Sequence, residues 1–312
     1  MYSKSWRYYR NFSILVILIV AMIAAAIYAL AHPVFWIVVL LVWIIRTPVR
    51  NAFIFAHPSR RLAWMPNSSL DFREVTFPTR DGLTLFGRFV PGRNRATILL
   101  LHGLGGSNVD MLLHAESLVR AGYGVFLIDL RAHGSGDGDT STYGLREAED
   151  VLGAVDYLLT RLDVNGQKIG ALGISLGAQA ALRATLKTEH IRALVLEGLN
   201  PSILSDHGGR PTSLRRWLNY PANWLYYRVY EFMIGGREVG VLDVIGKIAP
   251  RPVLFIASGA KDIYFSRLFY AAANEPKELW ELPEGLHGAA ILQGAQEYQS
   301  RLVRFFGQAL DV

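Results

Sequence analysis

The chain has 312 residues, of which 51% are hydrophobic and 19% are charged, so it can form one large domain or two small ones with a sizeable core. Cysteine is absent, which excludes disulfides, thiolate metal sites and a cysteine nucleophile. Residues 1–70 hold seven Lys and Arg and no Asp or Glu, so the net charge of +6 leaves −1 on residues 71–312. Because the basic residues belong to the N-terminal segment, no nucleic-acid-binding face is expected on the folded part.

The first predicted elements are apolar and N-terminal. Residues 12–31 carry no charge, and these twenty residues would span a bilayer core of about 30 Å as a helix. After His32 and Pro33 comes a second uncharged run, residues 34–45, which alone would reach only about 18 Å. A cleaved signal peptide is disfavoured, because the first run is long and a second follows it. Residues 1–45 are therefore expected to be a membrane anchor.

Two arrangements of this anchor are compatible with the sequence: a helical hairpin, and one steeply tilted, kinked helix. A hairpin turning near His32 and Pro33 is favoured, because it places both basic flanks on one side of the membrane, and the positive-inside tendency makes that side cytoplasmic. The following domain would then be cytoplasmic as well. Residues 46–70, with three prolines and four arginines, are predicted to form a basic linker. Within it, the apolar stretch of residues 53–55 either lies on the membrane surface or packs on the domain.

Residues 71–312 show strand and helix patterns in alternation after an initial hairpin. This alternation predicts an α/β domain with a mostly parallel sheet and helices on both of its faces. Residues 201–250 separate two strands by about fifty residues, far more than an ordinary connection, and are predicted to form an aromatic and basic cap. The expected strands are 72–78, 83–90, 96–101, 123–130, 168–172, 192–196, 252–258 and 277–282, and the expected helices are 109–121, 145–161, 177–182 and 289–310.

The stretch Gly173-Ile174-Ser175-Leu176-Gly177 joins one of these strands to a helix. A serine on so sharp a turn has an exposed hydroxyl, and the N–H of the next residue points to the place where an oxyanion would form. The bare pattern G-x-S-x-G is weak evidence in a glycine-rich chain, so its context carries the prediction. Ser175 is the candidate nucleophile, and the N–H of Leu176 is a candidate oxyanion donor.

A serine nucleophile needs a base, and the base needs a carboxylate that orients it. His287 follows the last predicted strand and Asp262 follows the strand before it, so both are expected at the carboxyl edge of the sheet. Glu197 ends another strand and is the alternative acid, because it meets the same general requirement. Asp262 is favoured, since the order Ser175, Asp262, His287 is that of one known group of triads.

Two further loops follow predicted strands. In the first, His102 is interpreted as structural, and the backbone N–H of Leu104 is the second candidate oxyanion donor. The second contains Asp129, Arg131 and His133, and is interpreted as a turn that these side chains hold together.

Taken together, these motifs resemble those of the α/β-hydrolase superfamily, over about three quarters of the chain. The resemblance rests on the serine turn, His102-Gly103, the loop from Asp129 to Ser135, Asp262 and His287. Among subfamilies, the chain is most similar to hydrolases that resemble serine aminopeptidases and acyl-thioesterases. The resemblance implies an eight-stranded sheet, with Ser175 as nucleophile, His287 as base and Asp262 as its orienting acid.

The expected function is a membrane-anchored serine hydrolase that cleaves carboxylic esters or related acyl bonds of an apolar small molecule. A peptidase or an acyl-thioesterase is the alternative within the enzymes. From another class, the chain could be a binding protein that kept the fold without the chemistry. No metal or redox cofactor is expected, because no H-E-x-x-H pattern and no cofactor motif after a strand is present.

Overall fold

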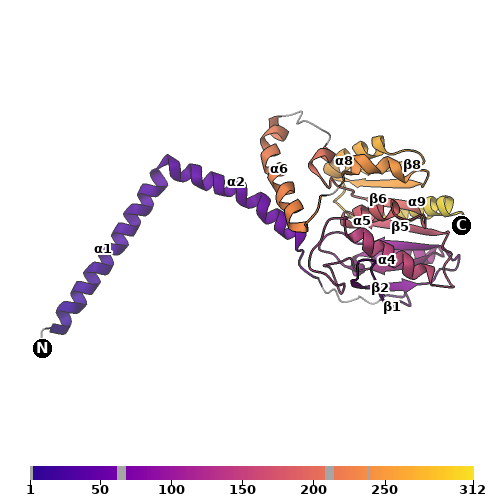
Figure 1. Ribbon diagram of the computed structural model, residues 1–312, viewed down its shortest axis with the longest axis horizontal. Helices are drawn as coiled ribbons and strands as arrows, with labels where there is room; N and C mark the ends of the chain where they lie inside the picture. The colour runs from indigo at the N-terminus through magenta and orange to yellow at the C-terminus, as the bar shows by residue number, and fades with distance from the viewer. Residues whose placement is uncertain (1–2, 62–67, 208–213, 238) are drawn as a thin grey trace. The chain divides into compact units, whose positions relative to one another are not determined.

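An eight-stranded sheet forms the centre of the computed structural model, which describes residues 3–61, 68–207, 214–237 and 239–312. The order of the strands is β1-β2-β4-β3-β5-β6-β7-β8 (Figure 1). β2 runs antiparallel to β1 and to β4, and all other neighbours are parallel. The predicted fold class and strand number are confirmed. The strands are β1 (Arg73–Pro78), β2 (Thr84–Val90), β3 (Thr97–Leu101), β4 (Gly124–Ile128), β5 (Ile169–Ile174), β6 (Ile191–Glu197), β7 (Val253–Ser258) and β8 (Lys277–Leu282).

The central strands are buried on both faces, which explains their continuous apolar sequences. In β3, Leu99 and Leu101 point to one face, where they pack with the helices α4 (Glu147–Leu159) and α5 (Leu176–Thr185). Ile98 and Leu100 point to the other face, where α3 (Leu112–Arg120) and α9 (Ala295–Leu310) contribute to the core. The alternation of side chains along a strand thus divides the interior into two apolar layers.

One long helix was not predicted. α8 (Gly259–Ala272) begins directly after β7 and packs on β7 and β8. Its buried Phe265 and Phe269 recur at a spacing of four residues, together with Ala273 just beyond its end. This helical spacing is present in the sequence, but only Asp262 was placed in this segment and no helix was predicted there. Single 3-10 turns, η1 (Asn108–Met111) and η4 (Ala290–Leu292), precede α3 and α9.

The predicted cap contains helices between β6 and β7. Its described elements are α6 (Leu214–Ile234), α7 (Val241–Val244) and the 3-10 turns η2 (Leu204–His207) and η3 (Ile245–Ile248). In Figure 1, α6 lies outside the layers that the sheet and its covering helices form. On its inner side Tyr230 and Ile234 are buried, whereas Trp217 is 65% exposed.

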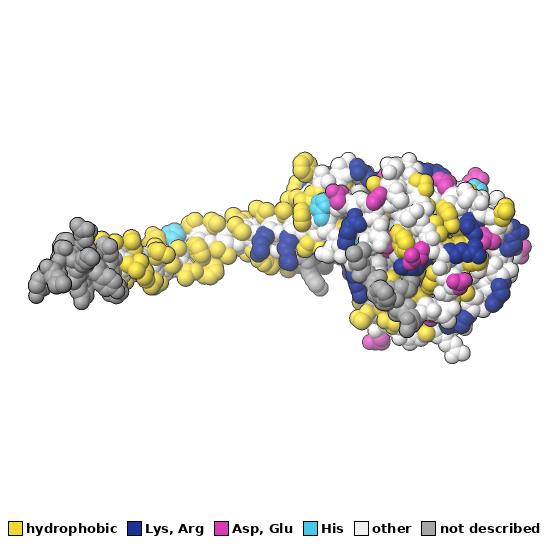
Figure 2. All heavy atoms as spheres, turned by 90° about the horizontal axis from the view of Figure 1, so that it is seen from below, with side chains coloured by type: hydrophobic (Ala, Val, Ile, Leu, Met, Phe, Trp, Pro, Cys, Tyr) yellow, Lys and Arg dark blue, Asp and Glu magenta, His cyan; other side chains and the backbone are white. Residues whose placement is uncertain are grey.

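The structure divides into two units, Met1–Arg50 and Asn51–Val312, which we describe separately. The first consists of α1 (Ser3–Ala31) and most of α2 (Pro33–Ala56). Both helices are long and apolar enough to cross a membrane. Hydrophobic side chains cover their described surface, whereas charges of both signs are interspersed over the second unit (Figure 2). Only His32 separates the two helices, so the loop of 2–5 residues that αα-hairpins use is not present at the predicted turn.

The predicted linker, residues 46–70, needs a correction. α2 continues through Pro48 to Ala56, and the second unit begins at Asn51 rather than at residue 71. Ala52 and Ala56 are fully buried in the core of this unit. Proline and arginine favour a linker locally, but the packing of the last turns of α2 on the domain outweighs that preference.

Candidate active site

Ser175 lies on the sharp turn between β5 and α5, as predicted. Its φ of 52° and ψ of −106° form an unusual backbone conformation of the kind that clusters at active sites. A Cβ at Gly173 would stand 2.3 Å from the backbone of Gly177, and a Cβ at Gly177 would stand 2.2 Å from the carbonyl oxygen of Leu101. Both glycines are therefore required by close approach of the backbone. The turn holds the serine at the carboxyl edge of the sheet.

Asp262 and His287 are brought together at the same edge, because they follow the neighbouring strands β7 and β8. The Nδ1 atom of His287 lies 2.8 Å from Oδ2 and 3.0 Å from Oδ1 of Asp262. Asp262 is 2% exposed at its side chain, and His287 is 45% exposed. With Nδ1 bound to the carboxylate, Nε2 is the nitrogen that remains for proton transfer.

A single pocket of about 860 Å³ is lined by Ser175, His287 and Leu104. Asp262 is not among the lining residues and lies behind the imidazole. Leu176 has a fully buried side chain, and its N–H belongs to the first turn of α5, where amides have no partner within the helix. The rest of the wall combines polar and charged side chains, among them Arg61, Asp110 and Lys261, with six aromatic ones. These are Phe55, Tyr143, Tyr226, Tyr227, Tyr230 and Phe265.

Glu197, the alternative acid, has other partners. One carboxylate oxygen accepts a hydrogen bond from the N–H of Ala290 at 3.0 Å, and the other accepts one from the hydroxyl of Tyr298 at 2.6 Å. Complete burial raises the pKa of this carboxyl, while the bonds from Tyr298 and Ala290 act in the opposite direction. The carboxylate beside the imidazole is thus that of Asp262.

The loop after β4 has the structural character that the sequence predicted. The carboxylate of Asp129 accepts hydrogen bonds from the N–H groups of Asn108 and Ser135, at 2.7 and 2.9 Å. His133 bonds through Nδ1 to the carbonyl of Arg131, and buried His102 accepts a bond from the N–H of Leu130. Burial lowers the pKa of His102 and that of His133, the latter to about 4.

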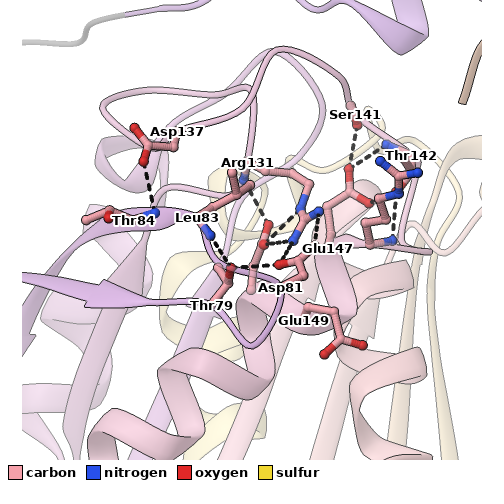
Figure 3. Close-up of polar contacts among 12 residues, drawn as sticks. Thr79, Asp81, Leu83, Thr84, Arg131, Asp137, Ser141, Thr142, Glu147 and Glu149 are labelled. Carbon is pink, nitrogen blue, oxygen red and sulfur yellow. Dashed lines mark hydrogen bonds and ion pairs between the residues drawn. The ribbon is translucent and has the colours of Figure 1, made fainter.

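Arg131 joins this loop to two other parts of the fold (Figure 3). Its guanidinium binds Asp81, in the turn between β1 and β2, and Asp150 of α4, with contacts of 2.6–2.9 Å. Burial alone would lower the pKa of Arg131, but the two carboxylates outweigh it and raise that pKa. The close-up also shows Glu147, which accepts bonds from Ser141, Thr142 and Gly144. These groups join the turn between β1 and β2, the loop after β4 and the segment before α4 to α4 itself.

Sequence reasoning missed part of the pocket wall. Phe55 comes from the last turn of α2, and its ring lies 6.0 Å from that of Tyr143 and 5.9 Å from that of Tyr226. Residues 53–55 were expected either to lie on the membrane surface or to pack on the domain, and Phe55 packs on the domain. His114 of α3 also lines the pocket. The helical spacing of residues 109–121 marked this helix, but no signal singled out His114.

Comparison with known proteins decides the family. The sequence profile of the alpha/beta hydrolase family matches residues 98–300. The chain belongs to the alpha/beta hydrolase family. A relative from Mycobacterium tuberculosis, the uncharacterized protein MT2364, is 32% identical over 217 residues, which are 68% of this chain and 70% of that protein. The uncharacterized protein YfhR of Salmonella typhimurium is 26% identical and covers 88% of this hydrolase and 94% of its own length.

Among solved structures, this hydrolase is similar to the esterase PF2001 of Pyrococcus furiosus, with a TM-score of 0.66 and 25% identity. The match covers 82% of this chain and 98% of the esterase. A hypothetical protein of Pseudomonas aeruginosa, PA2218, has a TM-score of 0.64 at 22% identity and supports the fold alone. Family and structural similarity therefore place the chain among the hydrolases.

Proposed function

We propose that the protein is a membrane-anchored serine hydrolase that cleaves carboxylic esters or related acyl bonds. The observation that carries the proposal is the 2.8 Å contact between His287 and Asp262 beside a pocket that His287 lines together with Ser175. Nucleophile, base and orienting acid are the three groups that such a reaction needs. A catalytically silent binding protein has no need for all three.

In the proposed reaction, His287 takes the proton of the Ser175 hydroxyl through Nε2 while Oγ attacks the acyl carbon. Asp262 keeps the ring in the correct orientation and stabilises the imidazolium that forms. The N–H groups of Leu104 and Leu176 donate to the oxyanion of the tetrahedral intermediate. His287 then gives its proton to the leaving group, and the acyl-enzyme is formed. In the second half of the reaction, water attacks the acyl carbon while His287 takes a proton from it. His287 then returns this proton to Oγ of Ser175 as the acid leaves.

The similarity to a Pyrococcus furiosus protein that is named an esterase favours an ester substrate over a peptide or a thioester. The aromatic side chains that form part of the pocket wall also suit an apolar acyl group. Substrate profiling separates the three possibilities, because matched ester, thioester and aminoacyl amide substrates share an acyl group and differ only in the leaving group.

The membrane anchor is proposed to be α1 and α2, whose apolar stretches are long enough to cross a bilayer. Arg46 and Arg50 follow the apolar run, and Arg60 and Arg61 lie near the start of the second unit. The positive-inside tendency then favours a cytoplasmic catalytic domain. A reporter fused after residue 70, read for cytoplasmic or external exposure, tests this orientation.

We also propose that the substrate reaches the pocket from the bilayer. One face of α6 lines the pocket with Tyr226 and Tyr230, whereas Trp217 and Trp224, on the outer side, are 65% and 47% exposed. Exposed tryptophans on a helix are typical of contact with a membrane interface. The proposal predicts a preference for long over short acyl chains.

The first test is intact-mass analysis of the full chain in detergent after exposure to a fluorophosphonate. One added phosphonyl group on the parent, and none on Ser175→Ala, is the expected result. A folded parent that gains no adduct in detergent or in vesicles would contradict the proposed chemistry.

A further inference from the structure

Glu197 occupies a position between the candidate nucleophile and the candidate base. Its backbone carbonyl accepts a hydrogen bond from the N–H of Ser175 at 2.9 Å. Its carboxylate accepts one from the N–H of Ala290, three residues after His287, at 3.0 Å. A single residue at the end of β6 therefore contacts both the serine turn and the segment that carries the histidine.

The histidine segment depends on such contacts, because its own residues are largely solvent-exposed. Leu286, next to His287, is 75% exposed, and the imidazole itself is 45% exposed at the side chain. By contrast, Ala290 and Glu197 are fully buried. The hydrogen bond between them thus anchors one end of the exposed loop in the protein interior.

Tyr298 holds the carboxylate of Glu197 from the other side. It belongs to α9, is fully buried, and donates its hydroxyl to Glu197 at 2.6 Å. Its ring packs against Trp280 of β8 and His114 of α3, with centroid distances of 5.8 and 5.4 Å. Two donors on two oxygens leave the carboxylate little freedom to rotate, and a buried carboxylate without donors would be costly.

We infer that Glu197 is a positioning residue that sets the separation between Ser175 and His287, with Tyr298 holding its carboxylate in place. The inference rests on the proposed serine hydrolase function. Proton transfer from Ser175 requires hydrogen-bond reach between its hydroxyl and Nε2 of His287, and displacement by about 1 Å can lower a rate by about 100-fold. Glu197 acts by accepting hydrogen bonds from the backbone N–H groups of Ser175 and Ala290, and it does not take part in proton transfer.

The experiment compares four variants of the full chain in detergent micelles. Glu197→Leu removes both bonds of the carboxylate. Glu197→Gln keeps them, because the amide oxygen can accept from Ala290 while the amide N–H donates to the hydroxyl oxygen of Tyr298. Tyr298→Phe removes one bond. Tyr123→Phe is the matched control, because its hydroxyl also bonds to α9 but to the carbonyl of Val303, whereas the hydroxyl of Tyr298 bonds to Glu197.

The readouts are the rate of fluorophosphonate labelling of Ser175 and the kcat and KM for p-nitrophenyl butyrate. They are measured below the melting temperature of each variant and normalised to folded protein. We expect Glu197→Leu to lower the labelling rate and kcat by about 100-fold while KM changes little. Tyr298→Phe should lower both by about fivefold to tenfold, the equivalent of one hydrogen bond. Glu197→Gln should recover most of the rate, and Tyr123→Phe should equal the parent.

Equal labelling rates of the parent, Glu197→Leu and Tyr298→Phe would overturn the inference and reduce Glu197 to a structural role, visible only in the melting temperature. If Glu197→Leu does not fold, the inference is tested by comparing the labelling rate of Tyr298→Phe with that of Tyr123→Phe. A slower rate in Tyr298→Phe alone supports the inference, and equal rates overturn it. A parent that is not labelled at all overturns the proposed function itself, so the two failures are distinguishable.

Discussion

Gly198 lies directly against His287, and a Cβ at this glycine would stand 2.8 Å from Cε1 of the imidazole. The same atom would be 3.2 Å from Oδ2 of Asp262. Gly198 also has a φ of +58°, a conformation that side chains disfavour. The residue after Glu197 therefore leaves the space in which the histidine and the aspartate meet.

Gly198→Ala is expected to displace the imidazole and to lower kcat by about 100-fold. Its backbone strain should cost about 1 kcal/mol of stability. The control is Gly235→Ala, because Gly235 has a similar φ of +64° and no atom of a described residue lies within 4 Å of an added Cβ. Ester hydrolysis and melting temperature are measured for both variants. Equal losses of activity in the two would mean that the contact with His287 has no effect.

Asp262→Asn should lower kcat by about 10⁴-fold, because an amide cannot hold the imidazole in the required tautomer. Glu197→Gln should stay within about tenfold of the parent, since both of its bonds can be kept. Steady-state hydrolysis of p-nitrophenyl butyrate gives both values. Full activity of Asp262→Asn together with an inactive Glu197→Gln would assign the acid to Glu197 instead.

Arg131→Met is expected to destabilise the protein by about 3–5 kcal/mol, because it leaves the fully buried carboxylate of Asp150 without its partner. Arg80→Met is the matched control. Its guanidinium also donates two hydrogen bonds to one carboxylate, that of Asp156, but both side chains are over 40% exposed, and such pairs contribute about 0.2–1 kcal/mol. Denaturant unfolding of the two variants checks the difference, and similar small losses would argue against a stabilising role of the buried network.

His114 should make the stability depend on pH. Burial lowers its pKa from 6.5 to about 4, and neither ring nitrogen has a hydrogen-bond partner among the residues that the structure describes. Between these two values the unfolded chain binds the proton and the folded protein does not, so stability falls as the pH falls from 6.5 towards 4. The full effect is about 3 kcal/mol. His133 acts in the same direction, because its pKa is also lowered to about 4.

His114→Phe keeps a ring against Tyr298 and removes the titrating group. Melting temperatures between pH 4.5 and 7 should therefore fall less steeply with acidification in this variant than in the parent. Parallel curves would show that protonation of His114 contributes nothing to the acid sensitivity.

The outer face of α6 gives a prediction about substrate delivery. Trp217→Ser combined with Trp224→Ser should lower hydrolysis of a long-chain ester presented in vesicles and leave hydrolysis of soluble p-nitrophenyl butyrate unchanged. The reason is that both side chains are exposed and lie outside the pocket that holds Ser175. The ratio of the two rates is the measurement, and an unchanged ratio would contradict entry from the bilayer.

The α/β fold, the apolar N-terminal segment and the place of Ser175 could be predicted from residue patterns along the chain, because these features depend on local patterns. A buried parallel strand is continuously apolar, and a serine between two glycines at the end of such a strand has one local geometry. His287 was found for a similar reason, since it directly follows the last strand.

Which carboxylate contacts the imidazole could be seen only in the folded chain. Asp262 and Glu197 both follow neighbouring parallel strands, and no local pattern shows that Ala290 and Tyr298, far along the chain, supply donors to Glu197. The same holds for Phe55, which the sequence placed in a linker. Its helix continues because Ala52 and Ala56 pack into the core. Contacts between distant residues set these positions, and their free energies exceed the local preferences that a sequence pattern reveals.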